Sequence, residues 1–227
     1  MKIINRYWYY SFLALGVLIL ATSSCKKDDS INQITDFDGN VYHAVTIGTQ
    51  VWMVENLKVT HYRNGDLIPN VTNNSEWNNV TTGAYRDYED NPDNSIKYGK
   101  LYNFFTITDS RQLCPAGWHV PTDDEWRVLR EYCGSCGGVL KEAGTENWLS
   151  PNTDATNKTG FSALPGGCLN ILDQYDGMAR YGVWWSSTEI RPYYAACWFL
   201  YYNSSFMSSP NGGALEWFGL SVRCVKD

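Results

Sequence analysis

A short amphipathic helix with a full set of start and stop signals is the feature that constrains this chain most. Thr122 is suited to the N-cap, and Glu125 follows at the spacing of a capping box, in which each side chain accepts the backbone N–H of the other residue. Trp126 and Leu129 share one face of this helix, and Gly134 is a natural end. The helix therefore has an apolar face that the rest of the domain must cover.

The composition favours sheets and turns around this helix over a bundle of helices. The 227 residues include 10 Trp, 16 Tyr, 8 Phe and 19 Gly, and 44% of the chain is hydrophobic, enough for one domain with its own core. The formal net charge of −6 gives a nucleic-acid partner no electrostatic support. We expect an α+β domain in which short helices pack on irregular antiparallel sheets.

Alternating and continuous apolar runs locate the expected elements. Residues 41–47 alternate as a half-buried strand does, and residues 51–54 follow after a turn. Residues 101–107 predict a short helix. Residues 70–96 are rich in Asn, Asp, Thr and Ser and predict a long surface loop. Three further strands are expected at residues 183–187, 195–202 and 218–225.

The chain begins with the pattern of an export signal. Lys2 and Arg6 supply positive charge, and the apolar run at residues 12–21 is shorter than a comfortable membrane span. Small residues then lead directly to Cys25, so the segment resembles a bacterial lipoprotein signal whose cysteine receives the lipid. Thr22 departs from the aliphatic residue usual at its position. The alternative is simple secretion with Cys25 as an ordinary residue.

A lipid on Cys25 would attach the protein to a membrane of the cell envelope. The charged tract behind this cysteine resembles that of Bacteroidetes lipoproteins, in which an acidic tract accompanies export to the cell surface. We expect an outer-membrane lipoprotein, on the periplasmic or the external side. It would consist of a signal peptide at residues 1–24, a lipidated tether at residues 25–35 and one domain at residues 36–227.

Six cysteines remain once Cys25 is set aside, and an even number suits an oxidising compartment. They predict three disulfides, with the connectivity left open by the sequence. Cys133 and Cys136 form a CxxC pair, which is typical of a local disulfide, a redox centre or half of a zinc site. Because no second CxxC or CxxH and no βαβ pattern accompanies it, the local disulfide is favoured.

Six sequence blocks, in a fixed order, resemble a known family. Together they are similar to the Fibrobacter succinogenes major paralogous domain, found in exported and lipidated proteins of Bacteroidetes and Fibrobacteres. The resemblance implies no particular activity, because the family has no settled biochemical function. The blocks are ENLKVTHYRNGDLIP, YGKLYNFF, CPAGWHVPTDDEW, TGFSALPGG, WWSSTE and GLSVRCVKD, over roughly residues 36–227.

A more distant similarity is to the C-type-lectin-like fold, which includes the formylglycine-generating enzymes. The likeness lies in the order of a helix, a cysteine, a capped helix, a tryptophan-rich strand pair and a final cysteine. It implies a disulfide between Cys114 and Cys224 that closes a loop of about 110 residues, for which chain entropy gives roughly 4–5 kcal/mol at most. Cys168 and Cys197, in neighbouring predicted strands, would bridge the sheet, and the CxxC pair would close on itself.

The sequence contains no convincing catalytic constellation. Its similarity to the oxidases is confined to PTDDEW, a capped helix, and Cys168 and Cys197 stand in surroundings unlike the copper-binding pair of those enzymes. The calcium motifs of lectins are not found, and His43, His61 and His119 lack metal-ligand spacing. We expect no enzyme activity, no cofactor and no metal, with a cysteine-pair oxidoreductase as the alternative from another class.

Aromatic residues near the end of the sequence are the remaining candidate ligand surface. Related folds bind ligands in this region, and rings beside Asn and Ser side chains can contact sugar rings or a protein. The hypothesis is a non-catalytic recognition or adhesion module for a glycan or a surface protein; the alternative is a structural subunit of a cell-surface assembly. The candidate residues are Tyr193, Tyr194, Trp198, Tyr201, Tyr202, Asn203, Phe206 and Trp217.

Overall fold

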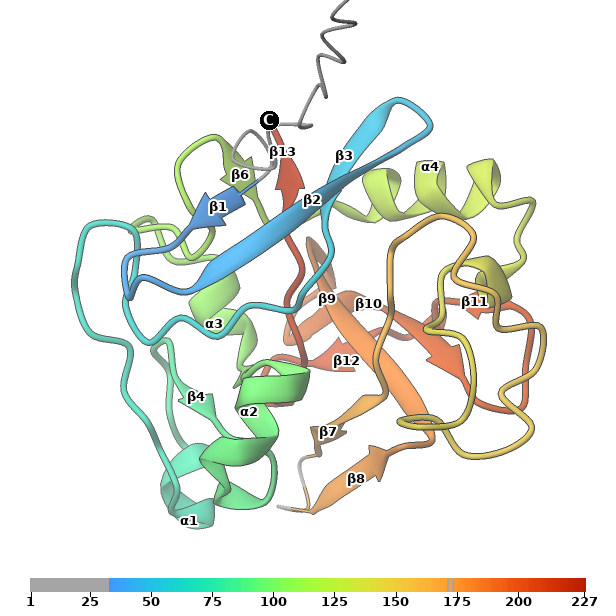
Figure 1. Cartoon of the computed structure of the whole chain (residues 1–227). Helices are drawn as coiled ribbons and strands as arrows, with labels where there is room; N and C mark the ends of the chain where they lie inside the picture. Colours follow the sequence, from blue (N-terminus) through green and yellow to red (C-terminus); the bar gives the residue numbers. More distant parts are fainter. Residues whose placement is uncertain (1–32, 171, 173) are drawn as a thin grey trace, which may run out of the picture.

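The computed structural model describes residues 33–170, 172 and 174–227 (Figure 1). The predicted signal peptide and Cys25, the predicted lipidation site, lie outside these residues. The last residues assigned to the tether belong to the fold, because β1 (Gln33–Thr35) pairs antiparallel with β2 (Val41–Ile47). The folded domain therefore includes a short strand that the sequence analysis leaves out.

The first sheet brings together strands from opposite ends of the described chain. Its order is β1-β2-β3-β13-β6, with β3 at Gln50–Met53, β13 at Val225–Lys226 and β6 at Trp118–His119. Figure 1 shows β13 beside β3. The disulfide that the resemblance implies is present between Cys114 and Cys224, with Cα atoms 6.2 Å apart. The inner part of the sheet is therefore held by hydrogen bonds and by a covalent bond.

A long antiparallel hairpin forms the second sheet. Its two strands pair with each other, and two short strands pair with the second of them. A separate two-stranded hairpin packs beside this sheet. The elements are β9 (Tyr181–Arg191), β10 (Tyr194–Tyr201), β11 (Met207–Ser208) and β12 (Ala214–Leu215), followed by the separate pair β7 (Gly166–Leu169) and β8 (Tyr175–Met178).

The strand predictions for this region are only partly correct. The predicted strands at residues 183–187 and 195–202 are confirmed by β9 and β10. The predicted strand at residues 218–225 is not continuous, because it makes isolated bridges to β5, β7 and β9, and regular pairing is confined to β13. Its apolar residues are buried by partners from several elements. The sequence pattern of such a segment is the same as that of one regular strand, so the two cannot be told apart from the sequence.

The capped helix is α4 (Asp123–Tyr132), and both halves of its capping box are present. Glu125 accepts the backbone N–H of Thr122 at 2.8 Å, and Thr122 accepts the backbone N–H of Glu125 at 3.3 Å. Ring centroids of neighbouring aromatic residues lie 4.7–6.4 Å from that of Trp126, which is buried. We call this group the tryptophan cluster: Trp52, Trp126, Trp184, Trp198 and Phe161.

The polar segment predicted as a surface loop, residues 70–96, is instead folded. Asn73 and Asn91 of this segment cap short helices, because each accepts a backbone N–H of the helix that follows, and Asn103 caps the next helix in the same way. Trp77 is buried. Only the second half of the next predicted helix is helical. The elements are α1 (Asn74–Trp77), β4 (Tyr85–Arg86), η2 (Tyr88–Asp90), α2 (Pro92–Tyr98), β5 (Leu101–Tyr102) and α3 (Phe104–Ile107).

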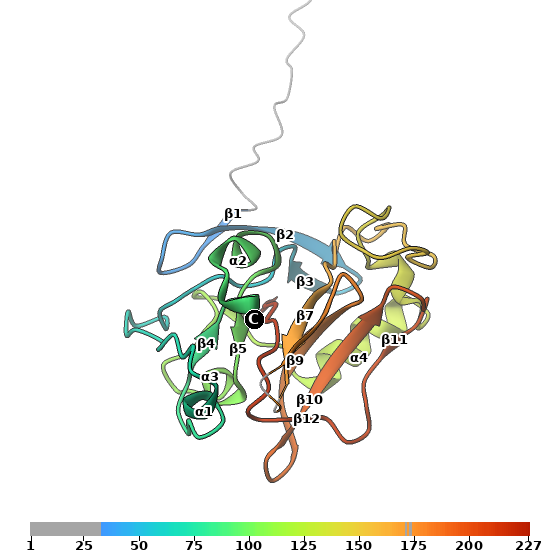
Figure 2. The same ribbon diagram turned by 90° about the horizontal axis from the view of Figure 1, so that it is seen from below.

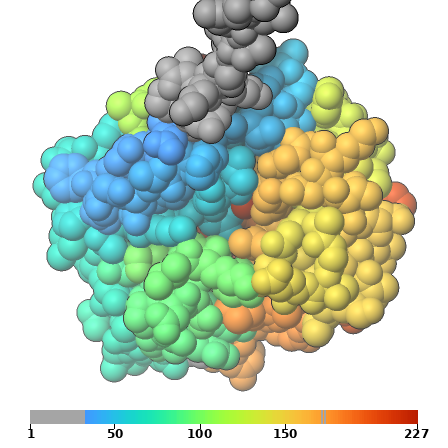
Figure 3. All heavy atoms as spheres, in the orientation of Figure 1, coloured from blue at the N-terminus to red at the C-terminus, as the bar shows by residue number. Residues whose placement is uncertain are grey.

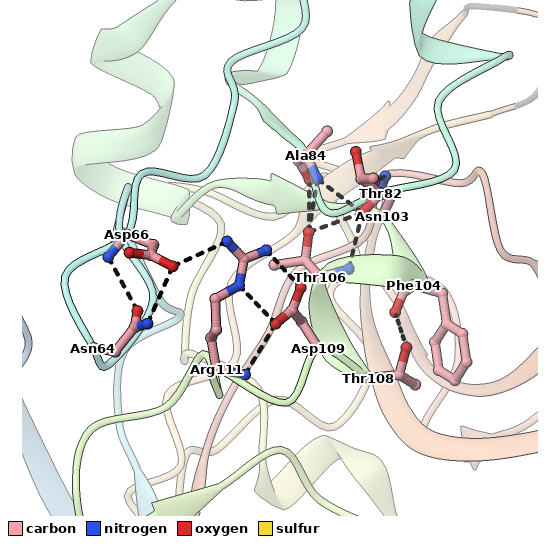
Figure 4. A network of polar contacts seen from close by, with 10 residues as sticks. All are labelled: Asn64, Asp66, Thr82, Ala84, Asn103, Phe104, Thr106, Thr108, Asp109 and Arg111. Carbon is pink, nitrogen blue, oxygen red and sulfur yellow. Dashed lines mark hydrogen bonds and ion pairs between the residues drawn. The ribbon is translucent and has the colours of Figure 1, made fainter.

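Two hydrogen-bond networks fix the loops around α3 (Figure 4). Arg111 contacts the Asp109 carboxylate at 2.7 Å and that of Asp66 at 3.3 Å, which joins two loops. The hydrogen bonds from Arg111 lower the pKa of Asp109 to about 2. Asn103 and Thr106 accept the backbone N–H of Ala84 at 3.0 and 2.9 Å. These polar groups hold one another, so we treat both networks as part of the scaffold.

The predicted α+β class, with short helices and antiparallel sheets, is confirmed. On the face shown in Figure 3, the irregular segment after α4 (yellow) lies beside the α2 region (green) and next to the β2–β3 hairpin (blue). That segment contains η3 (Gly137–Val139). In the part of the chain that the structure describes, no helix has the length and apolar character that crossing a membrane requires.

Candidate functional site

A cleft of about 440 Å³ opens between the β7–β8 hairpin, β10 and the segment that carries β12. We call it the β10 cleft. Its wall combines aromatic rings, polar side chains and two thiols, and it joins segments that are far apart in the sequence. The lining residues used below are Cys168, Asn170, Asp176, Tyr181, Tyr194, Cys197, Phe199 and Phe218.

Strand alternation decides which β10 side chains reach the cleft. Successive side chains of a strand point to opposite faces. Cys197 and Phe199 are two residues apart and both line the cleft. Trp198 between them is buried in the tryptophan cluster on the other face. The same strand therefore forms a wall of the cleft on one side and of the core on the other.

A chain of hydrogen bonds runs along one side of the cleft. The Asp176 carboxylate is paired with Arg180 and lies 3.0 Å from the Tyr181 hydroxyl. That hydroxyl lies 3.2 Å from the sulfur of Cys168. An ionised carboxylate only accepts hydrogen bonds, so Tyr181 donates to Asp176 and the Cys168 thiol donates to Tyr181. The arrangement fixes the Cys168 thiol beside the Asp176–Tyr181 pair.

Both thiols in the cleft are poor nucleophiles at neutral pH. Burial raises the pKa of Cys168 to about 11. Burial raises the pKa of Cys197 to about 12. Reactive cysteines have pKa values lowered by positive charge or by a helix N-terminus. The cleft is therefore lined by neutral sulfur groups, and its Asp176 carboxylate is compensated by Arg180.

Comparison with protein families gives one result. The family model of the Fibrobacter succinogenes major domain matches residues 45–226. The chain belongs to this family. Every residue named above as lining the cleft falls inside the matched Fibrobacter succinogenes major domain, as does the disulfide, whereas β1 and the first part of β2 precede it. Neither the curated proteins nor the solved structures include a match to the chain.

Within this family domain, the structure divides the predicted aromatic surface among several places. Tyr194 lines the cleft, and Tyr201 continues its wall, stacked on Phe199 with ring centroids 5.5 Å apart. Tyr193 and Trp217 form a separate pair, with centroids 5.9 Å apart. The predicted residues are thus not one continuous surface.

Trp198 is not available to a ligand, contrary to the sequence prediction. Its side chain is 1% exposed, and its indole N–H donates to Asp123 at 2.9 Å. Tyr202 packs against the tryptophan cluster, and Asn203 and Phe206 lie on the turn after β10 without lining the cleft. A tryptophan within an almost continuously apolar strand gives no local sign of the face on which it lies.

Several residues of the cleft were missed from the sequence. Asn170, Asp176 and Tyr181 belong to or flank the β7–β8 hairpin and the start of β9, and β8 was not predicted. The Asp176-Gly177 dipeptide, a common turn signal, lies within β8 and not in the turn between β7 and β8, so it does not indicate this hairpin correctly. Phe218 follows β12, a strand too short for its pattern to be recognised.

The predicted framework of three disulfides is corrected to one. Cys168 lies on β7 and Cys197 on β10, two strands that do not pair with each other. At the end of α4, the backbone N–H of Cys136 donates to the carbonyl of Cys133 at 3.1 Å, and the pair forms part of a turn. Burial raises the pKa of the Cys133 thiol to about 11. All four of these cysteines are free thiols.

Among the residues that the structure describes, no three His, Cys, Asp or Glu side chains gather closely enough to hold a metal ion. The three histidines each contact a carboxylate, with nitrogen–oxygen distances of 2.5–2.8 Å. His119 lies between Glu125 and Asp227 and connects the start of α4 to the end of β13. These contacts are structural ties between elements.

Proposed function

We propose that this family member is an exported lipoprotein of the cell envelope that binds a glycan in the β10 cleft. In this proposal the domain is a non-catalytic recognition or adhesion module with a C-type-lectin-like arrangement. The observation that carries it is the combination of aromatic ring faces with an amide, a carboxylate and a hydroxyl in one cleft of about 440 Å³. That volume lies within the usual range for small-ligand sites, about 300–1,000 Å³.

The chemistry of the wall supports a neutral ligand with polar edges and an apolar face. Tyr194, Phe199 and Phe218 offer ring surface, and Asn170 and Asp176 offer hydrogen-bonding groups. The carboxylate is compensated by a guanidinium and the thiols are protonated, so the wall has no uncompensated charge from these groups. A sugar ring has C–H faces and hydroxyl edges that match both kinds of group.

The same groups argue against catalysis in this cleft. A thiol redox centre needs a cysteine with a low pKa, whereas both thiols here have raised pKa values. Glycoside hydrolysis ordinarily needs two carboxyl groups across the scissile bond, and Asp176 is the one carboxylate among the described lining residues. Binding without turnover is therefore the function that the cleft supports best.

Attachment to a membrane rests on the sequence around Cys25. The positive residues, the short apolar run and the small residues before this cysteine support lipidation. We expect mass spectrometry of the protein from its native envelope to find an N-terminal diacylglyceryl-cysteine at position 25. An unmodified Cys25 in the mature protein would contradict the lipoprotein part of the proposal.

A glycan array probed with the purified protein tests the binding part. We expect a restricted set of glycans to bind, and Tyr194→Ala to weaken binding at least tenfold with the fold retained by circular dichroism. Phe206→Ala is the matched control, because this ring is 66% exposed and does not line the cleft. Equal loss in both variants, or turnover of a bound glycan, would contradict the proposal.

A further inference from the structure

A second aromatic group lies at the tip of the β9–β10 hairpin, separate from the lining of the β10 cleft. Tyr193 is 61% exposed, and its ring lies 5.9 Å from that of Trp217. Phe105 meets Trp217 edge-on, with centroids 5.6 Å apart. The loop that joins β9 and β10 extends beyond the rest of the ribbon at the bottom of Figure 2. This group is therefore presented where a large partner can reach it.

The backbone at this tip is unfavourable for the residue it carries. Arg191 pairs with Tyr194, so Pro192 and Tyr193 are the two central residues of the turn. Tyr193 has φ = +71°, a left-handed conformation that favours Gly or Asn at this position of a turn. Strained residues of this kind are concentrated at binding and switch regions. A tyrosine at this position lowers local stability but presents an exposed ring.

Two carboxylates accompany the rings without a cation of their own. Glu216 precedes Trp217, and its backbone N–H donates to the carbonyl of Tyr193 at 3.1 Å. Burial and then the charge of Glu189 raise the pKa of Glu216, so the two acidic groups are close enough to repel each other. In the described part of the chain, neither carboxylate forms an ion pair. The hairpin's guanidinium, Arg191, instead lies over the ring of Tyr194, 3.7 Å from its centroid.

We propose that the tip of the β9–β10 hairpin is a docking site for a protein partner that presents an arginine or lysine side chain. The cation stacks on the exposed ring of Tyr193, beside the partly exposed Trp217, and offsets the charges of Glu189 and Glu216. Both contacts favour a positive group, because ring faces attract cations and the carboxylates lack one. The contact of Arg191 with Tyr194 shows the same kind of pairing within this chain.

The test uses a short cationic peptide as the probe. The purified full chain is titrated with acetyl-Gly-Arg-Gly-Arg-Gly-amide and, as a control, with acetyl-Gly-Ser-Gly-Ser-Gly-amide. Binding is followed by NMR through the Trp217 indole signal, assigned with Trp217→Phe. We expect the arginine peptide to shift that signal and the serine peptide to leave it unchanged. The affinity for the arginine peptide should fall as the salt concentration rises.

Two variants separate recognition from folding. Tyr193→Gly should weaken binding of the arginine peptide about fivefold or more. The melting temperature of this variant should stay equal or rise, because Gly adopts a positive φ without strain. The double variant Glu189→Gln, Glu216→Gln should weaken binding of the arginine peptide to a similar extent, and the affinity that remains should depend less on salt. The cleft variant Tyr194→Ala removes the ring that holds Arg191, so the cleft control for this test is Phe218→Ala, which should leave peptide affinity unchanged.

Several outcomes would overturn the inference. Absence of any shift with the arginine peptide, equal affinity of the serine peptide, or unchanged binding in Tyr193→Gly would each do so. Loss of glycan binding in Tyr193→Gly, with no peptide binding in the unaltered chain, would assign this tip to the glycan site. Failure of the glycan array alone leaves the peptide result unaffected, so the two proposals fail separately.

Discussion

The tryptophan cluster and the β10 cleft are two aromatic regions built on the same hairpin, and they differ in what their polar groups contact. In the cluster, the indole N–H groups of Trp126, Trp184 and Trp198 donate to fixed acceptors within the protein, at 2.8–3.2 Å. In the cleft, Asn170 and Asp176 also have partners within the chain, but both side chains line an open volume. Aromatic content alone therefore does not identify a binding site.

The contrast is sharpest at two neighbouring residues of β10. Trp198 is buried in the cluster, and Phe199 lines the cleft with part of its surface accessible. One position along a strand changes the role of an aromatic ring from packing to contact with a ligand. The cluster should thus respond to substitution through stability, and the cleft through binding.

The largest effect is expected in the cluster. Trp126→Ala removes a fully buried ring and should lower the free energy of unfolding by about 3–5 kcal/mol. Phe218→Ala, in the cleft and only partly buried, should lower it by about 1–2 kcal/mol and abolish most glycan binding. Urea titrations of both variants, followed by circular dichroism, measure the difference. Similar destabilisation by the two would remove the distinction between the regions.

Removal of the disulfide tests whether the tryptophan cluster and the β10 cleft unfold together. Cys114→Ser with Cys224→Ser should lower the free energy of unfolding by about 2–4 kcal/mol, because the bond closes a loop with a sequence separation of 110 residues. Tryptophan fluorescence, to which the cluster contributes four of the 10 tryptophans, and alkylation of the cleft thiols should give one common transition. Two separate transitions would show that the disulfide couples regions that are otherwise independent.

Lys141 offers a pH test at the end of β10. Its ammonium group donates to the carbonyls of Tyr201 and Ser204, each at 3.0 Å, and burial lowers its pKa to about 8. Lys141→Met should lower the free energy of unfolding by about 1–3 kcal/mol at pH 7, because two carbonyls lose their donor.

The sign of the pH dependence follows from the same contact. Between pH 8 and about 10.4, the unfolded chain holds a proton on Lys141 that the folded chain has released, so the contribution of this group to stability rises with pH. This rise should be missing from Lys141→Met. Equal slopes for the two proteins, measured by urea titration across this range, would contradict the assignment.

The smallest effect is expected at His119, which is outside both aromatic regions. Burial alone would lower its pKa, but hydrogen bonds to Asp227 and Glu125 raise it overall. The ion pairs therefore stabilise the fold fully below pH about 6.5, and the stabilisation is lost as the pH rises through the raised pKa. His119→Gln should cost less than about 1 kcal/mol at pH 5.5, since these groups are partly exposed. A difference that grows with pH would contradict this sign.

Local signals predicted the parts of the fold that local interactions determine. The capping box at Thr122 and Glu125 depends on residues three apart, and it was predicted with its partners. The folding of residues 70–96 was missed because its burial depends on distant contacts. The indole N–H of Trp77, for example, donates to the carbonyl of Trp217, 140 residues away. The polar composition of the segment gave no sign of that contact.

The candidate site was predicted only in outline for a similar reason. The segment from Ala195 to Tyr201 is almost continuously apolar, so its sequence does not show which side chains face the core. Asp176 and Tyr181 reach the cleft through the β7–β8 hairpin, whose strands are short. The bond between Cys114 and Cys224 was predicted through the similarity to the C-type-lectin-like fold, since chain order leaves many pairings open.

The measurement that tests the β10 cleft most directly is protection of its thiols by a bound glycan. The protein is treated with iodoacetamide at pH 8.5, with and without the strongest ligand from the array, and modification of each cysteine is followed by peptide mass spectrometry. Cys168 and Cys197 line the cleft but are only 5% and 0% exposed, so their slow modification is followed over a long time course, and the partly buried Cys133 and Cys136 serve as internal controls. We predict slower modification of the first pair and unchanged rates for the second. Unchanged rates at Cys168 and Cys197 with the glycan bound would place the ligand elsewhere.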